Sequence, residues 1–342
     1  MIKMQRKLRA AVLRQIGQKL SVEELKTCPL TTGQVLVKMY YSGICRSQLM
    51  EQQGKRGADK WIPHLLGHEG YGIVEEIGEG VTKCKPGDPV VMSWVRGVGI
   101  DAQNPIYTDS YNENVNSGKI TTFSNFSVVS ENRLYLPPRG FSEKFLPLFG
   151  CALLTGGGMA LKYGRSVKVN KVCIIGFGGI GSAAGLVLKG MGKSFIEVVE
   201  NSPEKRRMAL SLGFKNVYSE LSESSGDFDL VIEASGTIDA IEKGFASLSN
   251  VGTLVFASHP VTGSKISLNP HDLIKGKRIF GTWGGDVNPD EDMVIIGEFI
   301  AKSGSNLELL LGELFTIDEV NEGLAYLDSG KPGRPLLKLN EV

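Results

Sequence analysis

The stretch VCIIGFGGIG at positions 172–181 decides how the second half of this chain folds. Its first four residues, Val172–Ile175, are apolar and mostly β-branched, which favours a buried strand. The glycines that follow fit the pattern G-x-G-x-x-G, and a helix is expected after them through Lys189. A strand, a glycine-rich turn and a helix in this order predict the first part of a unit of alternating strands and helices.

The residues of this turn have separate physical tasks. Gly176 is expected to make the tight turn, Gly178 to let the backbone approach a pyrophosphate, and Gly181 to let the helix pack close to the strand. Gly179 and Ile180 open the helix, whose free N–H groups and positive dipole end attract phosphate. Because 43 glycines make chance matches easy, the predicted dinucleotide site depends on the flanking strand and helix.

Glu200 ends the next expected strand, about 20 residues beyond the turn. A carboxylate at this position accepts hydrogen bonds from the adenosine ribose hydroxyls and repels a 2′-phosphate, so it favours NAD over NADP. Glu200 could instead only cap the helix that starts near Pro203. The basic run at 205–207 would tolerate a 2′-phosphate, but the carboxylate lies closer to the ribose position.

The two halves of the chain differ in the pattern of their predicted strands and helices. Residues 1–150 contain short apolar runs, such as 33–39, 71–77 and 88–92, separated by Gly, Pro and Asp turns, which predicts a β-rich region. Later segments alternate: strands are expected at 195–200, 230–234, 253–257 and 278–282, and helices at 203–212 and 238–248. Such alternation predicts a parallel sheet covered on both faces. The tail predicts a helix at 317–327 and a strand at 336–339.

A second motif, GHEGYGIVEEIGEGV at positions 67–81, fits G-H-E-x-x-G-x(5)-G-x-x-V. With it, the chain resembles the zinc-containing alcohol dehydrogenase branch of the medium-chain dehydrogenase/reductase superfamily, from GICRS at 43–47 to GRP at 333–335. The resemblance implies an α/β fold of two domains. Residues 1–152 and 292–342 would form a β-rich GroES-like catalytic domain, and residues 153–291 a Rossmann-type, doubly wound parallel-sheet domain.

The resemblance places the ligands of one catalytic zinc on Cys45, His68 and Cys151. Two thiolates and an imidazole suit this metal, and three protein ligands leave a fourth position for a substrate oxygen or water. Glu69 is either a group behind the ligands or a transient extra ligand. Many relatives bind a structural zinc through four further cysteines, but the stretch 93–136 has none. We expect no structural zinc and a loop ordered by other contacts.

In the resembled mechanism, zinc is a Lewis acid toward the alcohol and NAD accepts the hydride. Ser47 matches the hydroxyl that relays the alcohol proton, although it could only cap a turn. Gln48 stands where relatives usually have Asp, and it could accept the imidazole N–H through its carbonyl oxygen. Met50 stands where relatives often have His. Met50 cannot relay a proton. We therefore expect turnover to fall more steeply at low pH than in relatives that have His at this position.

The resemblance assigns further residues to the cofactor and substrate. Arg46 and Arg334 match positions that contact the pyrophosphate, a task suited to bidentate arginine. Lys205 matches a basic residue near the ribose, and Thr155 one packed against the nicotinamide. Trp94 falls where an aromatic residue often lines the substrate pocket.

Bulk properties exclude several classes of protein. The net charge of +1 provides no field for nucleic acid or anionic lipid. The apolar segments 145–161 and 172–188 are shorter than the ~20 residues of a membrane span, and they predict Gly-dense turns of a buried core. Five cysteines without paired spacing, and no apolar leader after the first basic residues, indicate a reducing cytoplasm.

We therefore expect a zinc alcohol dehydrogenase that transfers hydride between a primary or secondary alcohol and NAD, as a homodimer or homotetramer. The same chemistry on a polyol, a sugar derivative or a formaldehyde thiol adduct stays open, although polyol-specific relatives generally have Glu in place of Cys151. A zinc-free NADPH enone or quinone reductase would lack the ligands and the acidic residue. A non-enzymatic nucleotide-binding relative would have lost ligands, and none is lost.

Overall fold

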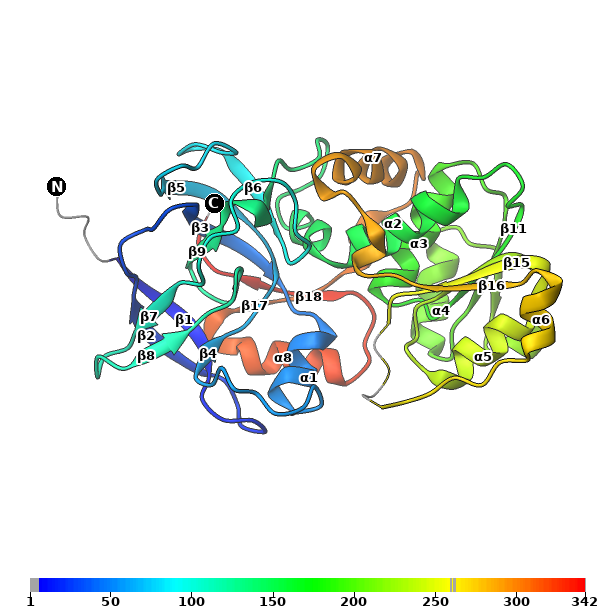
Figure 1. The fold of residues 1–342 in the computed structure, drawn as a ribbon, viewed down its shortest axis with the longest axis horizontal. Helices are drawn as coiled ribbons and strands as arrows, with labels where there is room; N and C mark the ends of the chain where they lie inside the picture. Colours follow the sequence, from blue (N-terminus) through cyan, green and yellow to red (C-terminus); the bar gives the residue numbers. More distant parts are fainter. Residues whose placement is uncertain (1–5, 259, 261–262, 342) are drawn as a thin grey trace. The chain divides into compact units, whose positions relative to one another are not determined.

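The computed structural model describes residues 6–258, 260 and 263–341 (Figure 1). The chain forms two compact units, residues 1–151 with 311–342, and residues 152–310. The sequence predicted the first domain boundary one residue later, after residue 152, and the second before residue 292. The second position differs because residue 292 lies inside α7 (Pro289–Lys302), which contacts α2 (Ala152–Gly164) and α3 (Gly179–Gly190) of the second unit.

The first unit contains a closed barrel and a seven-stranded sheet. The barrel order is β1 (Lys7–Leu13), β2 (Ser21–Lys26), β7 (Ile106–Thr108), β8 (Asn114–Asn116) and β4 (His64–Leu65). The sheet order is β10 (Leu134–Tyr135), β6 (Pro89–Ser93), β5 (Glu69–Ile77), β3 (Gln34–Gly43), β18 (Arg334–Lys338) and β17 (Leu311–Thr316), and β9 (Phe126–Ser130) also pairs with β3. The predicted β-rich, GroES-like region is confirmed, since alternate apolar side chains of these strands fill its core.

The tail of the chain completes this sheet. β18 runs antiparallel to β3 with Leu336 opposite Gly43, and the Ile44 N–H donates to the Pro335 carbonyl at 2.9 Å. The expected helix is present as α8 (Val320–Asp328), which packs beside α1 (Arg46–Gln52). The return of the tail therefore brings Arg334 to the end of β3, just before Cys45.

The second unit is built on a parallel sheet, as predicted. Its order is β13 (Asn216–Tyr218), β12 (Phe195–Val199), β11 (Lys171–Ile175), β14 (Phe228–Glu233), β15 (Leu248–Phe256) and β16 (Arg278–Gly281). The short strand β13 was not expected from the sequence. Between the strands lie α3, α4 (Pro203–Ser211), α5 (Ile238–Ala246) and α6 (Pro270–Lys275).

Helices cover both faces of this sheet. A Cβ added at Gly181 or Gly185 of α3 would meet Ile174, whereas one added at Gly244 of α5 would meet Ile175. Because neighbouring residues of a strand point to opposite faces, α3 and α5 lie on opposite sides. The doubly wound arrangement is therefore confirmed.

One expectation about the apolar segments was wrong. Residues 152–164 form the continuous helix α2, where the sequence predicted Gly-dense turns. The glycines lie inside this helix because it packs tightly on α3: a Cβ at Gly156 would lie 2.0 Å from the Ile180 carbonyl oxygen. Within the described residues, no helix combines the length and apolar character needed to cross a membrane.

Candidate functional site

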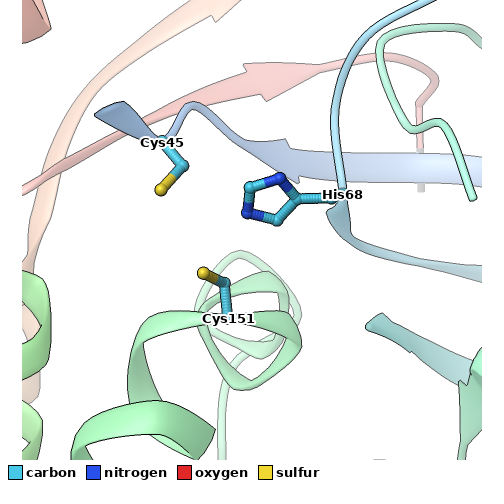
Figure 2. Close-up of side chains that lie close together, drawn as sticks. All are labelled: Cys45, His68 and Cys151. Carbon is cyan, nitrogen blue, oxygen red and sulfur yellow. The ribbon is translucent and has the colours of Figure 1, made fainter. Parts of the chain in front are cut away.

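Cys45, His68 and Cys151 come together in the first unit. Their ligand atoms all lie within 4.8 Å of one another, and Figure 2 shows the three side chains turned toward a common space. Across the part of the chain that the structure describes, this is the one group of three or more His, Cys, Asp or Glu side chains with such spacing. The fold thus assembles the predicted ligand set.

The ends of three elements position these ligands. Cys45 is the N-cap of α1, His68 immediately precedes β5, and Cys151 follows a short 3-10 turn. The last two are held by one sheet, because Glu69 lies opposite Ser93 and the Ser93 hydroxyl donates to the carbonyl before Cys151 at 2.7 Å. Paired strands therefore fix ligands that lie far apart in the sequence.

The donor set fits a zinc ion. His68 Nε2 is buried without a hydrogen-bond partner, and it lies on the side of the ring that faces the two sulfur atoms (Figure 2). A buried nitrogen left unsatisfied costs free energy, and a metal bound to Nε2 would remove that cost. Two cysteines, one histidine and no fourth protein ligand are the ligand set of a catalytic zinc site.

The surroundings favour a thiolate at Cys45. The hydrogen bond with Cys151 and the charges of Arg334 and His68 hold the pKa of Cys45 well below its usual value, although burial opposes this. The pKa of Cys151 is raised well above its usual value by the Cys45 sulfur and by burial. The thiolate is the metal-binding form of cysteine, so one ligand of the pair is already prepared for a metal.

A buried ion pair lies behind the ligands. Glu69 is fully buried, and its Oε1 atom is 3.3 Å from Nε of Arg334, whose side chain is 10% exposed. Arg334 also donates to the Ile44 carbonyl at 3.2 Å. Because Glu69 is outside the group with metal-ligand spacing, the pair supports its interpretation as a group behind the ligands. The pyrophosphate contact of Arg334 stays a prediction.

Gln48 contacts both Cys45 and His68. It is 1% exposed, its Oε1 accepts the Cys45 N–H at 2.9 Å, and its amide nitrogen contacts Nδ1 of His68. The sequence predicted that the amide oxygen would accept from the imidazole, but here this oxygen is taken by the backbone. The reason is local, because Gln48 is the third residue of α1 and closes its capping box.

Ser47 and Met50 also belong to α1. The Ser47 hydroxyl is 3.5 Å from His68 Nδ1, which is longer than a well-formed hydrogen bond. The position of Ser47 on the helix that carries Cys45 supports its predicted relay role, which stays a prediction. Met50 is half-buried, and the pH dependence predicted from it also stays a prediction.

The glycine turn of the second unit has the geometry that a phosphate site needs. Gly176 has a φ of +86°, and a Cβ there would lie 2.7 Å from the Ser235 backbone nitrogen. A Cβ at Gly181 would lie 1.9 Å from the Gly176 carbonyl oxygen, whereas one at Gly178 would meet open space. The fold therefore requires glycine at positions 176 and 181, whereas at Gly178 the backbone is open to a ligand.

Two carboxylates flank this turn. Glu200 follows β12 and accepts from the Phe177 N–H at 2.7 Å and the Ser202 N–H at 2.8 Å. Glu233, which sequence analysis missed, ends β14 and accepts from the Ser235 N–H at 2.7 Å. Burial raises the pKa of Glu233, and its second oxygen has no hydrogen-bond partner. An acidic residue within the apolar run DLVIEA was the sequence signal for it.

Comparisons with known proteins find a matching family model in each of the two units. The model of the alcohol dehydrogenase GroES-like domain matches residues 31–139, and that of the zinc-binding dehydrogenase family matches residues 179–301. The chain belongs to the medium-chain dehydrogenase/reductase superfamily. It is an oxidoreductase of the zinc-type dehydrogenase family.

Several solved structures share the fold over nearly the whole chain. The alcohol dehydrogenase zinc-binding domain protein of Burkholderia ambifaria has a TM-score of 0.89 and 22% identity, covering 99% of this chain and 100% of that one. Benzyl alcohol dehydrogenase of Acinetobacter calcoaceticus has a TM-score of 0.85 and 23% identity, and the match covers 98% of this chain and 100% of that one. CAD of Helicobacter pylori, solved with NADP(H), has a TM-score of 0.78 and 21% identity, and the match covers 98% of this chain and 99% of that one.

The remaining superfamily positions lie as follows. Arg46 is exposed at the start of α1, and Trp94 is half-buried directly after β6. In the second unit, Thr155 is buried in α2 and Lys205 is half-buried in α4. Their contacts with cofactor or substrate stay predictions.

Carboxylates make several contacts with the stretch 93–136, in which we expected no structural zinc. Glu131, 1% exposed, accepts from the Thr82 and Ile100 N–H groups at 3.0 and 2.7 Å. Asp109 accepts from the Tyr111 and Glu113 N–H groups, each at 2.9 Å, and from Arg14 at 2.7 Å. These residues were not singled out in the sequence, because a carboxylate in a loop has no distinctive spacing.

Proposed function

We propose that this chain is a zinc-dependent dehydrogenase that transfers hydride between a primary or secondary alcohol and NAD. The observation that carries this proposal is the group of Cys45, His68 and Cys151, with a buried imidazole nitrogen that lacks any protein partner. A zinc-free reductase of the same fold would have no use for this donor set. A scaffold protein would have no reason to keep an unsatisfied buried nitrogen.

Zinc held there would supply a Lewis acid that lowers the pKa of an alcohol oxygen, and NAD would accept the hydride. The residues of the chain do the remaining work. Cys45 and Cys151 provide negative charge, His68 completes three fixed donors, and the buried ion pair of Glu69 and Arg334 supports them from behind. Ser47 is proposed to accept the alcohol proton, because its hydroxyl both donates and accepts.

The proposed preference for NAD follows from Glu200. Its carboxylate is fixed by two backbone N–H groups at the end of β12, where a negative charge repels a 2′-phosphate. Arg206, one of the basic residues at 205–207, donates instead to the carbonyls of Glu200 and Asn201, each at 2.8 Å. We expect Glu200→Gln to lower the NAD-to-NADP ratio of kcat/KM by about tenfold, equal to ~1.4 kcal/mol.

Metal analysis beside a panel of alcohols, polyols and the glutathione adduct of formaldehyde tests the proposal directly. Each substrate is assayed with NAD and with NADP. One zinc per chain with NAD-linked oxidation of simple alcohols is the expected result. A metal-free native protein that works only with NADPH on enones would overturn it, and preference for a polyol would redirect the substrate assignment.

A homodimer or homotetramer in a reducing cytoplasm completes the proposal. The five cysteines are free thiols, and β16 has a sheet neighbour on one side only among the described strands. Phe280 in β16 and Ile274 in α6 are exposed, Ile274 by 79%, which suits burial against a second copy. Light scattering of Phe280→Asp should show a smaller particle than the parent chain, while Val167→Asp, at an exposed site outside β16 and α6, should not.

A further inference from the structure

Gln48 has a single hydrogen-bond acceptor but faces two groups at the metal-ligand cluster. Its Oε1 accepts the Cys45 N–H at 2.9 Å, and its amide nitrogen contacts Nδ1 of His68. A side-chain amide combines one acceptor oxygen with one NH₂ donor group. In the arrangement observed, the NH₂ group donates to the imidazole, so Nδ1 must carry a lone pair.

This arrangement conflicts with the binding of a metal by His68. When Nε2 donates its lone pair to a metal, the neutral ring carries its proton on Nδ1 and must donate from there. The oxygen and the NH₂ group occupy opposite branches of the amide, one at each partner. The oxygen can therefore face the Cys45 N–H or the His68 N–H, and the other N–H then faces the NH₂ group, which cannot accept. Gln48 is 1% exposed, so water has little access to take the place of either partner. The Ser47 hydroxyl, 3.5 Å from Nδ1, is too distant to accept well.

We propose that Gln48 is a positioning residue that couples metal loading to the N-terminal cap of α1. On metal binding the amide turns, its oxygen accepts the His68 Nδ1–H, and the Cys45 N–H loses its capping acceptor. The inference rests on the proposed function only in that zinc occupies the three ligands. Its consequence is that part of the zinc-binding free energy is spent on opening the cap, so this site holds zinc less tightly than one with a carboxylate at position 48.

A carboxylate would remove the conflict, because its two oxygens can accept from both donors at once. We therefore expect Gln48→Glu to bind zinc about tenfold more tightly, the lower end of the effect of residues that support metal ligands. The added negative charge alone would also attract zinc. Met50→Glu is the matched control, since it places the same charge on α1 two residues away, without access to both hydrogen-bond partners.

The deciding measurements use the full chain and do not depend on turnover. Zinc affinity is measured by competition with a chromophoric chelator in the parent chain and in both variants. Nitrogen-15 NMR of the histidine rings, assigned by loss of the His68 signal in His68→Asn, gives the tautomer with and without zinc. Hydrogen exchange at the Cys45 amide reports whether the cap is closed.

The expected result has three parts. The His68 proton moves from Nε2 to Nδ1 on zinc binding, exchange at the Cys45 amide accelerates at least tenfold in the parent chain, and this acceleration is absent in Gln48→Glu. A proton already on Nδ1 without zinc, or a Cys45 amide equally protected in both states, would overturn the inference while leaving the proposed function intact. Equal gains in affinity for Gln48→Glu and Met50→Glu would also overturn it. A chain that binds no zinc would defeat both proposals.

Discussion

Two polar regions of the first unit satisfy their buried groups in opposite ways. At Cys45, His68 and Cys151, a buried imidazole nitrogen has no protein partner and two thiols share a site. In the stretch 93–136, Glu131 and Asp109 direct their oxygens at backbone N–H groups 2.7 to 3.0 Å away. The first region gathers three side chains with metal-ligand spacing, and in the second region carboxylates bind backbone N–H groups.

This difference suggests one way in which carboxylates can hold a loop together. Four thiolates around zinc and one carboxylate with several N–H donors do the same geometric task, since each draws distant backbone segments to one point. Glu131 joins residues 82 and 100, and Asp109 joins its own turn to Arg14 on the barrel side.

The largest effect is expected from Cys45→Ala. Losing a thiolate should remove zinc and lower kcat by about a thousandfold or more, because Lewis-acid stabilisation amounts to several kcal/mol. Metal analysis and NAD-linked alcohol oxidation measure this, and circular dichroism checks the fold. Cys84→Ala, which removes a buried thiol outside the cluster, is the control and should keep its zinc. Retention of zinc by Cys45→Ala would contradict the ligand assignment.

Chelation should separate the two regions by stability. A ligand present at a hundred times its Kd stabilises the folded state by about 2.7 kcal/mol, so zinc removal should lower the Tm of the parent chain. Cys45→Ala should show no such response to chelator. Hydrogen exchange at Ile100, Tyr111 and Glu113 should stay unchanged, and loss of protection there would mean that the loop also depends on a metal.

Glu131→Gln should destabilise the chain by about 1–3 kcal/mol, because an amide NH₂ would then face buried N–H donors. Urea unfolding monitored by fluorescence gives the free energy. Zinc content should not change, since Glu131 does not contact the cluster. Glu24→Gln, at an exposed ion pair with Lys7, should change stability by less than about 0.5 kcal/mol. An equal effect of the two variants would contradict the role given to Glu131.

The smallest effect concerns Asp109 and pH. The hydrogen bond from Arg14, with backbone N–H groups, lowers the pKa of Asp109 in the folded chain. A lowered folded-state pKa contributes stability above the unfolded value of about 3.9, and this contribution is lost as pH falls through the folded value. The stability gap between the parent chain and Asp109→Asn should be widest at pH 7 and narrow below about pH 4. A gap that is independent of pH would show that the charge of Asp109 is irrelevant.

Much of the fold was accessible from the sequence because its rules are local. The strand before the glycine turn was predicted at Lys171–Ile175, and the structure has it with these bounds. The helix α7 was missed, although its buried residues Met293, Ile296 and Ile300 recur at helical spacing. Its assignment to the second unit depends on packing against α2 and α3. A domain boundary that depends on such packing cannot be predicted from the periodicity of apolar residues in the sequence.

The sequence by itself determined the metal-ligand types, the glycine turn and the alternation of strands and helices, since each follows from chemistry or backbone conformation over a few residues. Only the tertiary structure decided which side chains and backbone groups contact these residues. Arg334 reaches the Ile44 carbonyl across 290 residues and pairs with Glu69, and both ends of the Gln48 amide are engaged. These partners depend on which strands meet, because a hydrogen bond requires two groups within about 3 Å whatever their distance in sequence.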